Sequence, residues 1–148
     1  MNFINKLLNG IFILIIISAS FTFARAGEIE LITNKSNTIN NLDQSEVRAI
    51  FSMRIKTWSN NQPIHVFVLE QNNPVHEQFC KDILKIFPYQ LQAGWDRLVF
   101  SGTGEAPKVF NSEALLIAAI LSTPGSIGYI LKEEGHNENI NVHVITIQ

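Results

Sequence analysis

The chain has 148 residues, 46% of them hydrophobic and 16% charged, and a formal net charge of −2. This length suits one domain with a real hydrophobic core and is too short for two lobes. Without a cluster of Lys and Arg, the weakly acidic balance excludes nucleic acid or an anionic membrane surface as an expected partner. Cys80 is the single cysteine, so no internal disulfide forms, and we expect a small buried residue rather than a reactive thiol.

Residues 1–26 have the pattern of a signal peptide. Lys6 supplies the positive start, residues 10–23 are apolar, and Ala24 and Ala26 stand where a cleavage site needs small side chains. The apolar stretch is shorter than the ~20 residues that span a bilayer, so we favour cleavage after Ala26 over an uncleaved membrane anchor. The expected product is periplasmic, with no stable membrane span. Nine basic and thirteen acidic side chains would remain in it, a formal charge of −4.

The first half of the expected domain alternates strands and helices. Residues 28–33 first alternate between polar and apolar side chains and then become apolar, which predicts a strand at or near a sheet edge. A polar loop is expected at 34–41. Asp43 with Glu46 three residues later forms a capping box, which predicts a helix that ends before Trp58. Residues 64–69 are apolar on both faces, the pattern of a strand covered on both sides in a largely parallel sheet.

The second half contains three expected helices and two closing strands. Asn73 and Pro74 are a typical helix start, and the apolar stripe that follows extends to residue 86. A helix over residues 91–98 follows the Phe87-Pro88 break, and a glycine-containing loop occupies 100–108. After a cap at Asn111 or Ser112, residues 114–121 are all apolar, so this helix should be buried on nearly every side.

Closing strands at 127–131 and 141–147, separated by a polar loop at 132–139, complete the pattern. The predicted fold class is α/β, with a mixed, mostly parallel sheet and helices on both faces.

Three separated segments together resemble a known family. They are the block IFSMRIKTW at 50–58, the strand containing Ile64 and Val66, and TPGSIGY at 123–129. In this order they are similar to the second half of the phosphate-binding proteins that feed bacterial phosphate ABC transporters. Met53 departs from the pattern, since those proteins usually have Gly there. The resemblance covers roughly residues 42–131 and implies one lobe of a type 2 periplasmic binding protein, here residues 27–148.

The resemblance also locates the expected binding junction, directly after Leu69. There the phosphate-binding proteins carry an Arg and a Ser-Gly-Thr group, and this chain has neither, because it reads EQNNPVH over residues 70–76. Helix N-termini still attract anions, so we expect the ligand contacts to come from Gln71, Asn72, Asn73 and His76. Against this, Glu70 and Glu77 bring negative charge, and the alternative interpretation is a helix start with no ligand role.

A second candidate is the loop with Gly102, Thr103, Gly104 and Lys108, for which the alternative is an ordinary turn. The Ser101-Gly102-Thr103 group lies too late in the chain to take over the phosphate role.

No catalytic arrangement is recognisable. The segment around Ser126 is not a nucleophile elbow, and the histidines at 65, 76, 136 and 143 lack metal-ligand spacing. We therefore expect neither an enzyme nor a bound metal or cofactor.

Two functions are consistent with these features. The first is an exported solute-binding protein of the phosphate-binding type, with a small anion such as phosphate as ligand and an ABC transporter permease as partner. The second is a single-lobe interaction or sensor domain that binds another periplasmic protein and has no transport role. Proteins of this class close two lobes on their ligand, so one lobe offers only half of a cleft. A homodimer could rebuild that cleft.

Overall fold

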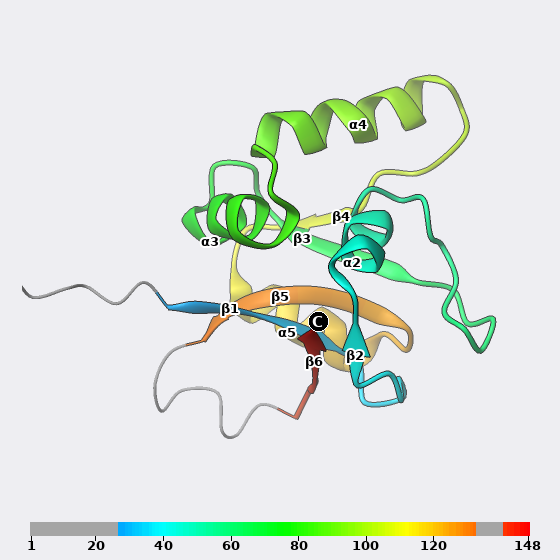
Figure 1. Ribbon diagram of the computed structural model, residues 1–148, viewed down its shortest axis with the longest axis vertical. Helices are drawn as coiled ribbons and strands as arrows, with labels where there is room; N and C mark the ends of the chain where they lie inside the picture. Colours follow the sequence, from blue (N-terminus) through cyan, green and yellow to red (C-terminus); the bar gives the residue numbers. More distant parts are fainter. Residues whose placement is uncertain (1–26, 133–140) are drawn as a thin grey trace, which may run out of the picture.

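The computed structural model describes residues 27–132 and 141–148 (Figure 1). The predicted signal peptide lies outside these residues, as do His136 and nearly all of the predicted loop at 132–139. The elements are β1 (Glu28–Thr33), β2 (Asn41–Leu42), α2 (Gln44–Phe51), β3 (His65–Leu69), α3 (Pro74–Gln78), the π-helix η1 (Phe79–Leu84), α4 (Pro88–Phe100), β4 (Lys108–Phe110), α5 (Glu113–Ser122), β5 (Ser126–Lys132) and β6 (His143–Ile147).

The described strands form one six-stranded sheet with the order β2-β6-β1-β5-β3-β4. Strand β3 is parallel to both β4 and β5, β2 is parallel to β6, and β1 is antiparallel to both of its neighbours. Parallel pairings therefore outnumber antiparallel ones, and the predicted mixed, mostly parallel α/β sheet is confirmed.

The prediction that residues 28–33 lie at or near a sheet edge is wrong. Strand β1 pairs along its full length with β5, and Leu31–Thr33 also pair with β6 on the other side. Its first residues lack a β6 partner, which explains why Glu28 and Glu30 are polar while Leu31 and Ile32 are fully buried. The second neighbour, β6, comes from the far end of the described sequence. The local alternation of polar and apolar residues cannot reveal such a long-range pairing.

Two adjacent residues of β5 show which helices cover each face of the sheet, because successive side chains of a strand point to opposite faces. A Cβ at Gly128 would meet Leu116 and Ile120 of α5 at 2.9 Å. The ring of Tyr129 stacks on Phe79 with centroids 3.9 Å apart and lies near Phe51. Helix α5 thus covers one face, and α2 with η1 covers the other (Figure 1).

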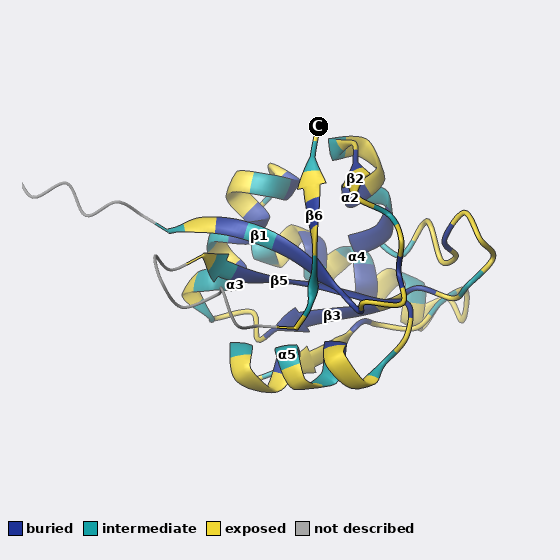
Figure 2. Ribbon diagram, turned by 90° about the horizontal axis from the view of Figure 1, so that it is seen from below, coloured by how far each residue is buried: buried dark blue, intermediate teal, exposed yellow. Residues whose placement is uncertain are grey.

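The prediction that the apolar helix after Ser112 is buried on nearly every side is wrong. Leu116 and Ile120 of α5 are fully buried, but Leu115 and Leu121 are 53% and 44% exposed. Figure 2 shows why: α5 forms the outermost layer on its face, with exposed residues along its outer side. Among the described residues nothing packs over that side, so a helix of uniform apolarity need not lie in the centre of a fold.

Three short elements differ from the sequence-based assignment. The strands β2 and β4 are not predicted, since the assignment has loops at 34–41 and 100–108, and two or three residues are too few to show a period. The helix from Pro74 continues beyond Gln78 as a π-helix and ends at Lys85, whose φ is 57°. The predicted starts at Asp43, Asn73 and Ser112 are confirmed, each with the side chain accepting a backbone N–H.

The family segments make direct contact with one another. The indole N–H of Trp58 donates to the carbonyl of Gly125 at 2.9 Å. Gly125 has a φ of +77°, and a Cβ there would lie 2.4 Å from the carbonyl oxygen of Pro63. The block at 50–58 and the segment at 123–129 are therefore two sides of one contact, which explains why they occur together.

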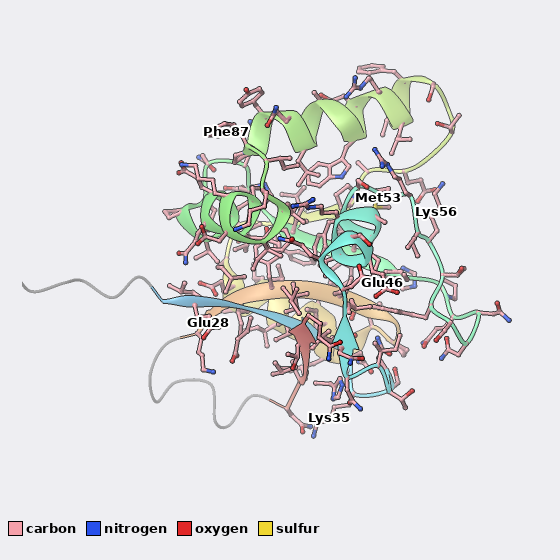
Figure 3. All side chains as sticks on the ribbon, viewed as in Figure 1. Glu28, Lys35, Glu46, Met53, Lys56 and Phe87 are labelled. Atoms are coloured by element: carbon pink, nitrogen blue, oxygen red, sulfur yellow. The ribbon has the colours of Figure 1, made fainter. Side chains whose placement is uncertain are left out.

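Met53 ends helix α2 in a backbone conformation that favours glycine. Its φ is 61°, its N–H donates to the Ile50 carbonyl, and the N–H of Arg54 donates to the Ala49 carbonyl. These two bonds form a Schellman motif, in which the left-handed residue after the cap is usually Gly. The glycine expected from the family resemblance thus has a structural reason, and this chain places a half-buried methionine there instead (Figure 3).

We predict that a Met53→Gly variant is more stable than a Met53→Ala variant by about 1 kcal/mol. Both changes remove the half-buried side chain, so their difference reports the cost of a Cβ at positive φ, less the extra chain entropy that glycine loses on folding. Urea denaturation of the two variants measures it. Equal midpoints would contradict the left-handed assignment.

Candidate functional site

The carboxyl ends of β3, β4 and β5 meet at one edge of the sheet, the edge where ligands bind in open α/β sheets. The N–H of Glu70 donates to the Phe110 carbonyl at 3.0 Å, which places the turn after β3 beside the start of α5. The carboxylate of Glu113 accepts the N–H of Leu131 at 2.7 Å and thereby ties α5 to the end of β5. This carboxyl edge is the candidate site.

The turn at 70–73 presents polar side chains to solvent. Gln71 and Asn72 are exposed, and the turn is closed by the N–H of Asn73 donating to the Glu70 carbonyl. The side chain of Asn73 is half-buried, and its oxygen accepts the N–H of Val75 at 2.8 Å as the cap of α3. Gln71 and Asn72 are therefore available for ligand contacts, while the oxygen of Asn73 already has a structural partner.

His76 lies inside the protein, unlike the other predicted site residues. Its side chain is 1% exposed, its Nδ1 contacts the hydroxyl of Tyr129, and its Nε2 is 3.5 Å from the sulfur of Cys80. Burial lowers the pKa of His76 to about 4, so the ring is neutral at physiological pH. In this position the ring cannot meet a ligand at the surface, which corrects our expectation of a contact from His76.

The hydrogen bonds of the Tyr129 hydroxyl indicate which nitrogen of the buried His76 ring carries the proton. The hydroxyl accepts the N–H of Leu69 at 2.9 Å, and its own proton needs an acceptor, which the Nδ1 of His76 supplies. The proton of the neutral imidazole then lies on Nε2 and faces Cys80. Cys80 is buried, as expected. Burial raises the pKa of its thiol to about 12, which favours the protonated form.

The charges near the turn do not favour a multivalent anion. Glu70 is exposed, and Glu77 pairs with Lys81. Lys132, at the end of β5, pairs with Glu30 at 2.8 Å. Lys81 and Lys132 are therefore each already matched by a carboxylate.

The second candidate loop lies at the opposite edge of the sheet. Lys108 is in register with Phe67 and Phe110 with Leu69, so the chain enters β4 at the edge where β3 begins. The structure does not bring this loop together with the turn at 70–73.

Gly102 has a structural role of its own. Its φ is +69°, and it ends α4 through bonds from Gly102 to Val99 and from Thr103 to Leu98, the same motif as at Met53. The ammonium near the loop belongs to Lys56, which donates to the Thr103 carbonyl at 3.1 Å. Lys108 lies over the ring of Phe110 instead. The geometry fits the alternative interpretation of an ordinary turn, which here follows the end of α4.

Within residues 27–132 and 141–148, no three His, Cys, Asp or Glu side chains are grouped as metal ligands would be. The helices of the same residues include none that is long and apolar enough to cross a membrane.

Family comparison agrees with this architecture. The sequence model of the PBP superfamily domain matches residues 24–144. The chain therefore belongs to the PBP superfamily. No curated protein matches the chain.

Solved structures share the fold. An ABC-type phosphate transport receptor from Vibrio cholerae is 16% identical with a TM-score of 0.63, and the match covers 82% of this chain and 47% of that protein. PstS from Borrelia burgdorferi is 18% identical with a TM-score of 0.64, and the match covers 82% of this chain and 47% of that protein. A putative phosphate ABC transporter substrate-binding protein with bound phosphate, from Clostridium perfringens, is 18% identical with a TM-score of 0.63. That match covers 82% of this chain and 45% of that protein. The chain thus spans about half the length of these proteins.

Sequence reasoning missed the two residues that hold the site in place. Tyr129 fixes the end of β3 from beneath the turn, and Glu113 fixes the start of α5. Tyr129 is the last residue of the family segment TPGSIGY, so its presence in that segment was a signal of its importance. Its partner, the N–H of Leu69, could not be inferred, because it lies 60 residues away along the chain.

The buried histidine predicts a specific pH dependence. The pKa of His76 is about 4 when folded and near 6.5 when unfolded, so its contribution to stability is complete above pH 6.5 and is lost as the pH falls toward 4. In that window this one group reduces the free energy of unfolding by up to about 1.4 kcal/mol per pH unit. Urea denaturation between pH 7.5 and 4 measures the slope.

The control for this experiment is His76→Gln, whose amide oxygen can still accept the Tyr129 proton but does not titrate. Exposed carboxylates contribute equally in both proteins. Parallel pH profiles for the two proteins would contradict a buried neutral histidine.

Proposed function

We propose that this chain is an exported, single-lobe solute-binding protein of the phosphate-binding type, which holds a small anion at the carboxyl edge of its sheet. The observation that carries the proposal is the exposed polar turn at 70–73, placed at the strand-to-helix junction of a fold shared with phosphate-transport proteins. Gln71 and Asn72 supply the amide contacts, with Asn73 shaping the turn. The signal-peptide pattern of residues 1–26 supports export to the periplasm.

The charges at this edge narrow the ligand class. A phosphate dianion needs strong charge compensation, and Lys81 and Lys132 are already paired with carboxylates. Amide N–H groups can hold a singly charged anion such as a small carboxylate with less compensation. We therefore place small carboxylates before phosphate and sulfate as ligands of this site.

Calorimetric titration tests the ligand contacts. We expect at least one of acetate, phosphate and sulfate to release heat, and the double variant Gln71→Ala/Asn72→Ala to lose it. Each lost amide contact to an anion is worth about 1 kcal/mol, so the double change should weaken binding at least tenfold. The matched control is Asn40→Ala, an exposed amide in the segment before β2. Equal heats from the double variant and the wild type would contradict the proposal.

The chain corresponds to about half of the Vibrio cholerae receptor, the size of one lobe. Ligand capture in this class closes two lobes around the solute. We propose that a second copy completes the cleft and that the closed form docks on an ABC transporter permease.

The half-length match also supports the alternative function, a periplasmic interaction or sensor domain with no transport role. Light scattering separates the two: the rebuilt cleft predicts a dimer that the bound anion stabilises. A monomer at all concentrations, with and without anion, would contradict the rebuilt cleft and favour the interaction domain.

A further inference from the structure

A groove runs between the end of α2 and helix α4, on the face of the sheet that α2 and η1 cover. Its two hollows, of about 810 Å³ and 320 Å³, share Ser52, Arg54 and Leu91 and are therefore continuous. We call it the arginine groove and define it by Arg48, Ser52 and Arg54 on one side and by Leu91, Gly94 and Arg97 on the other. In Figure 1 the C-terminal end of α2 points toward α4 across this region.

The groove is lined by all three arginines that follow the predicted cleavage site, Arg48, Arg54 and Arg97. No Asp or Glu lines it. Within the described part of the chain none of the three forms an ion pair, whereas Lys81 and Lys132 both do. Arg97 donates only to the Ala93 carbonyl of its own helix, at 3.1 Å. An otherwise acidic domain thus keeps three guanidinium groups without a carboxylate partner together, and like charges held close favour an anionic partner.

The floor of the groove is apolar. Leu91 and Trp95 are buried with 4% and 3% exposure, and Ile86 and Leu98 are half-buried beside them. Trp95 is fixed from below, since its indole N–H donates to the Phe51 carbonyl at 2.8 Å. A rigid apolar floor between cationic walls suits an occupant with both acidic and apolar side chains.

Gly94 is a second, independent sign of an occupant. It lies in the interior of α4, where alanine is the better helix former, and a Cβ there would meet nothing within 4 Å. Neither backbone conformation nor packing within the described residues requires glycine. The missing side chain keeps the middle of the groove open for close approach.

The shape of the groove favours a chain segment over a single small ion. It follows α4 from Gln90 to Ser101, roughly 16 Å at the rise of an α-helix, and its arginines come from both walls. We propose that the arginine groove is a docking site for an acidic, amphipathic peptide segment of a partner protein. Arg48, Arg54 and Arg97 pair with its carboxylates, and its apolar side chains pack on Leu91 and Leu98 over Gly94. This site is separate from the carboxyl edge and does not depend on the solute proposal.

Fluorescence polarisation tests the proposal with a labelled helical peptide of glutamate and leucine, long enough to span the groove. We expect the peptide to bind, a matched peptide of lysine and leucine not to bind, and added salt to weaken binding. The variants Arg54→Glu and Arg97→Glu should each weaken binding about tenfold. Gly94→Leu should block it by filling the groove while leaving the thermal melting of the protein intact. Lys35→Glu, the same charge reversal far from α4 in Figure 3, should leave binding unchanged.

Several outcomes would overturn the proposal. One is equal binding of the two peptides, and another is an equal loss in Lys35→Glu and Arg97→Glu. Inorganic phosphate that binds, with loss in Arg97→Glu and no peptide binding, would assign the groove to a small anion. A dimer that Gly94→Leu dissociates would make the occupant a second copy of this chain. Failure of the peptide test leaves the anion titration at Gln71 and Asn72 unaffected, so the two proposals fail separately.

Discussion

The hydroxyl of Tyr129 is the contact on which the rest of the structure depends. The ladder between β3 and β5 contains only the pairs from His65 and Val66, so the N–H of Leu69 needs another partner, and the tyrosine provides it. The same hydroxyl orients His76, and the ring stacks on Phe79. One side chain thereby joins the central sheet, the start of α3 and the helical layer. The position of the turn at the carboxyl edge follows from this contact.

The parts of the fold that the sequence predicts are those with a local cause. Asp43 with Glu46 specifies a helix start, and the two-sided apolar pattern of residues 64–69 specifies a covered parallel strand. The family segments were informative for a reason that the structure explains: Trp58 donates to Gly125, and Gly128 makes room for α5. These contacts maintain the scaffold, so they indicate the fold and leave the ligand open.

The rest could not be predicted because its causes are distant in the chain. Whether β1 is an edge strand depends on β6, more than one hundred residues later, and the exposure of α5 depends on whether anything packs outside it. His76 follows a polar turn and has the sequence context of a surface residue, yet Tyr129 and Cys80 enclose it. For the candidate site, the sequence therefore identified the exposed amides and misplaced the one residue whose environment is built from other elements.

The pairing of β1 has a consequence for the time at which the chain can fold. Its first strand lies between β5 and β6, with Glu28 opposite Lys132 and Leu31 opposite Ile145. Contacts between residues so far apart form slowly, because nearly the whole chain must be enclosed in one loop before they are made. For a chain exported N-terminus first, as we propose, the central strand pairs only after residues 126–147 have followed it. The central sheet would therefore be completed late in translocation.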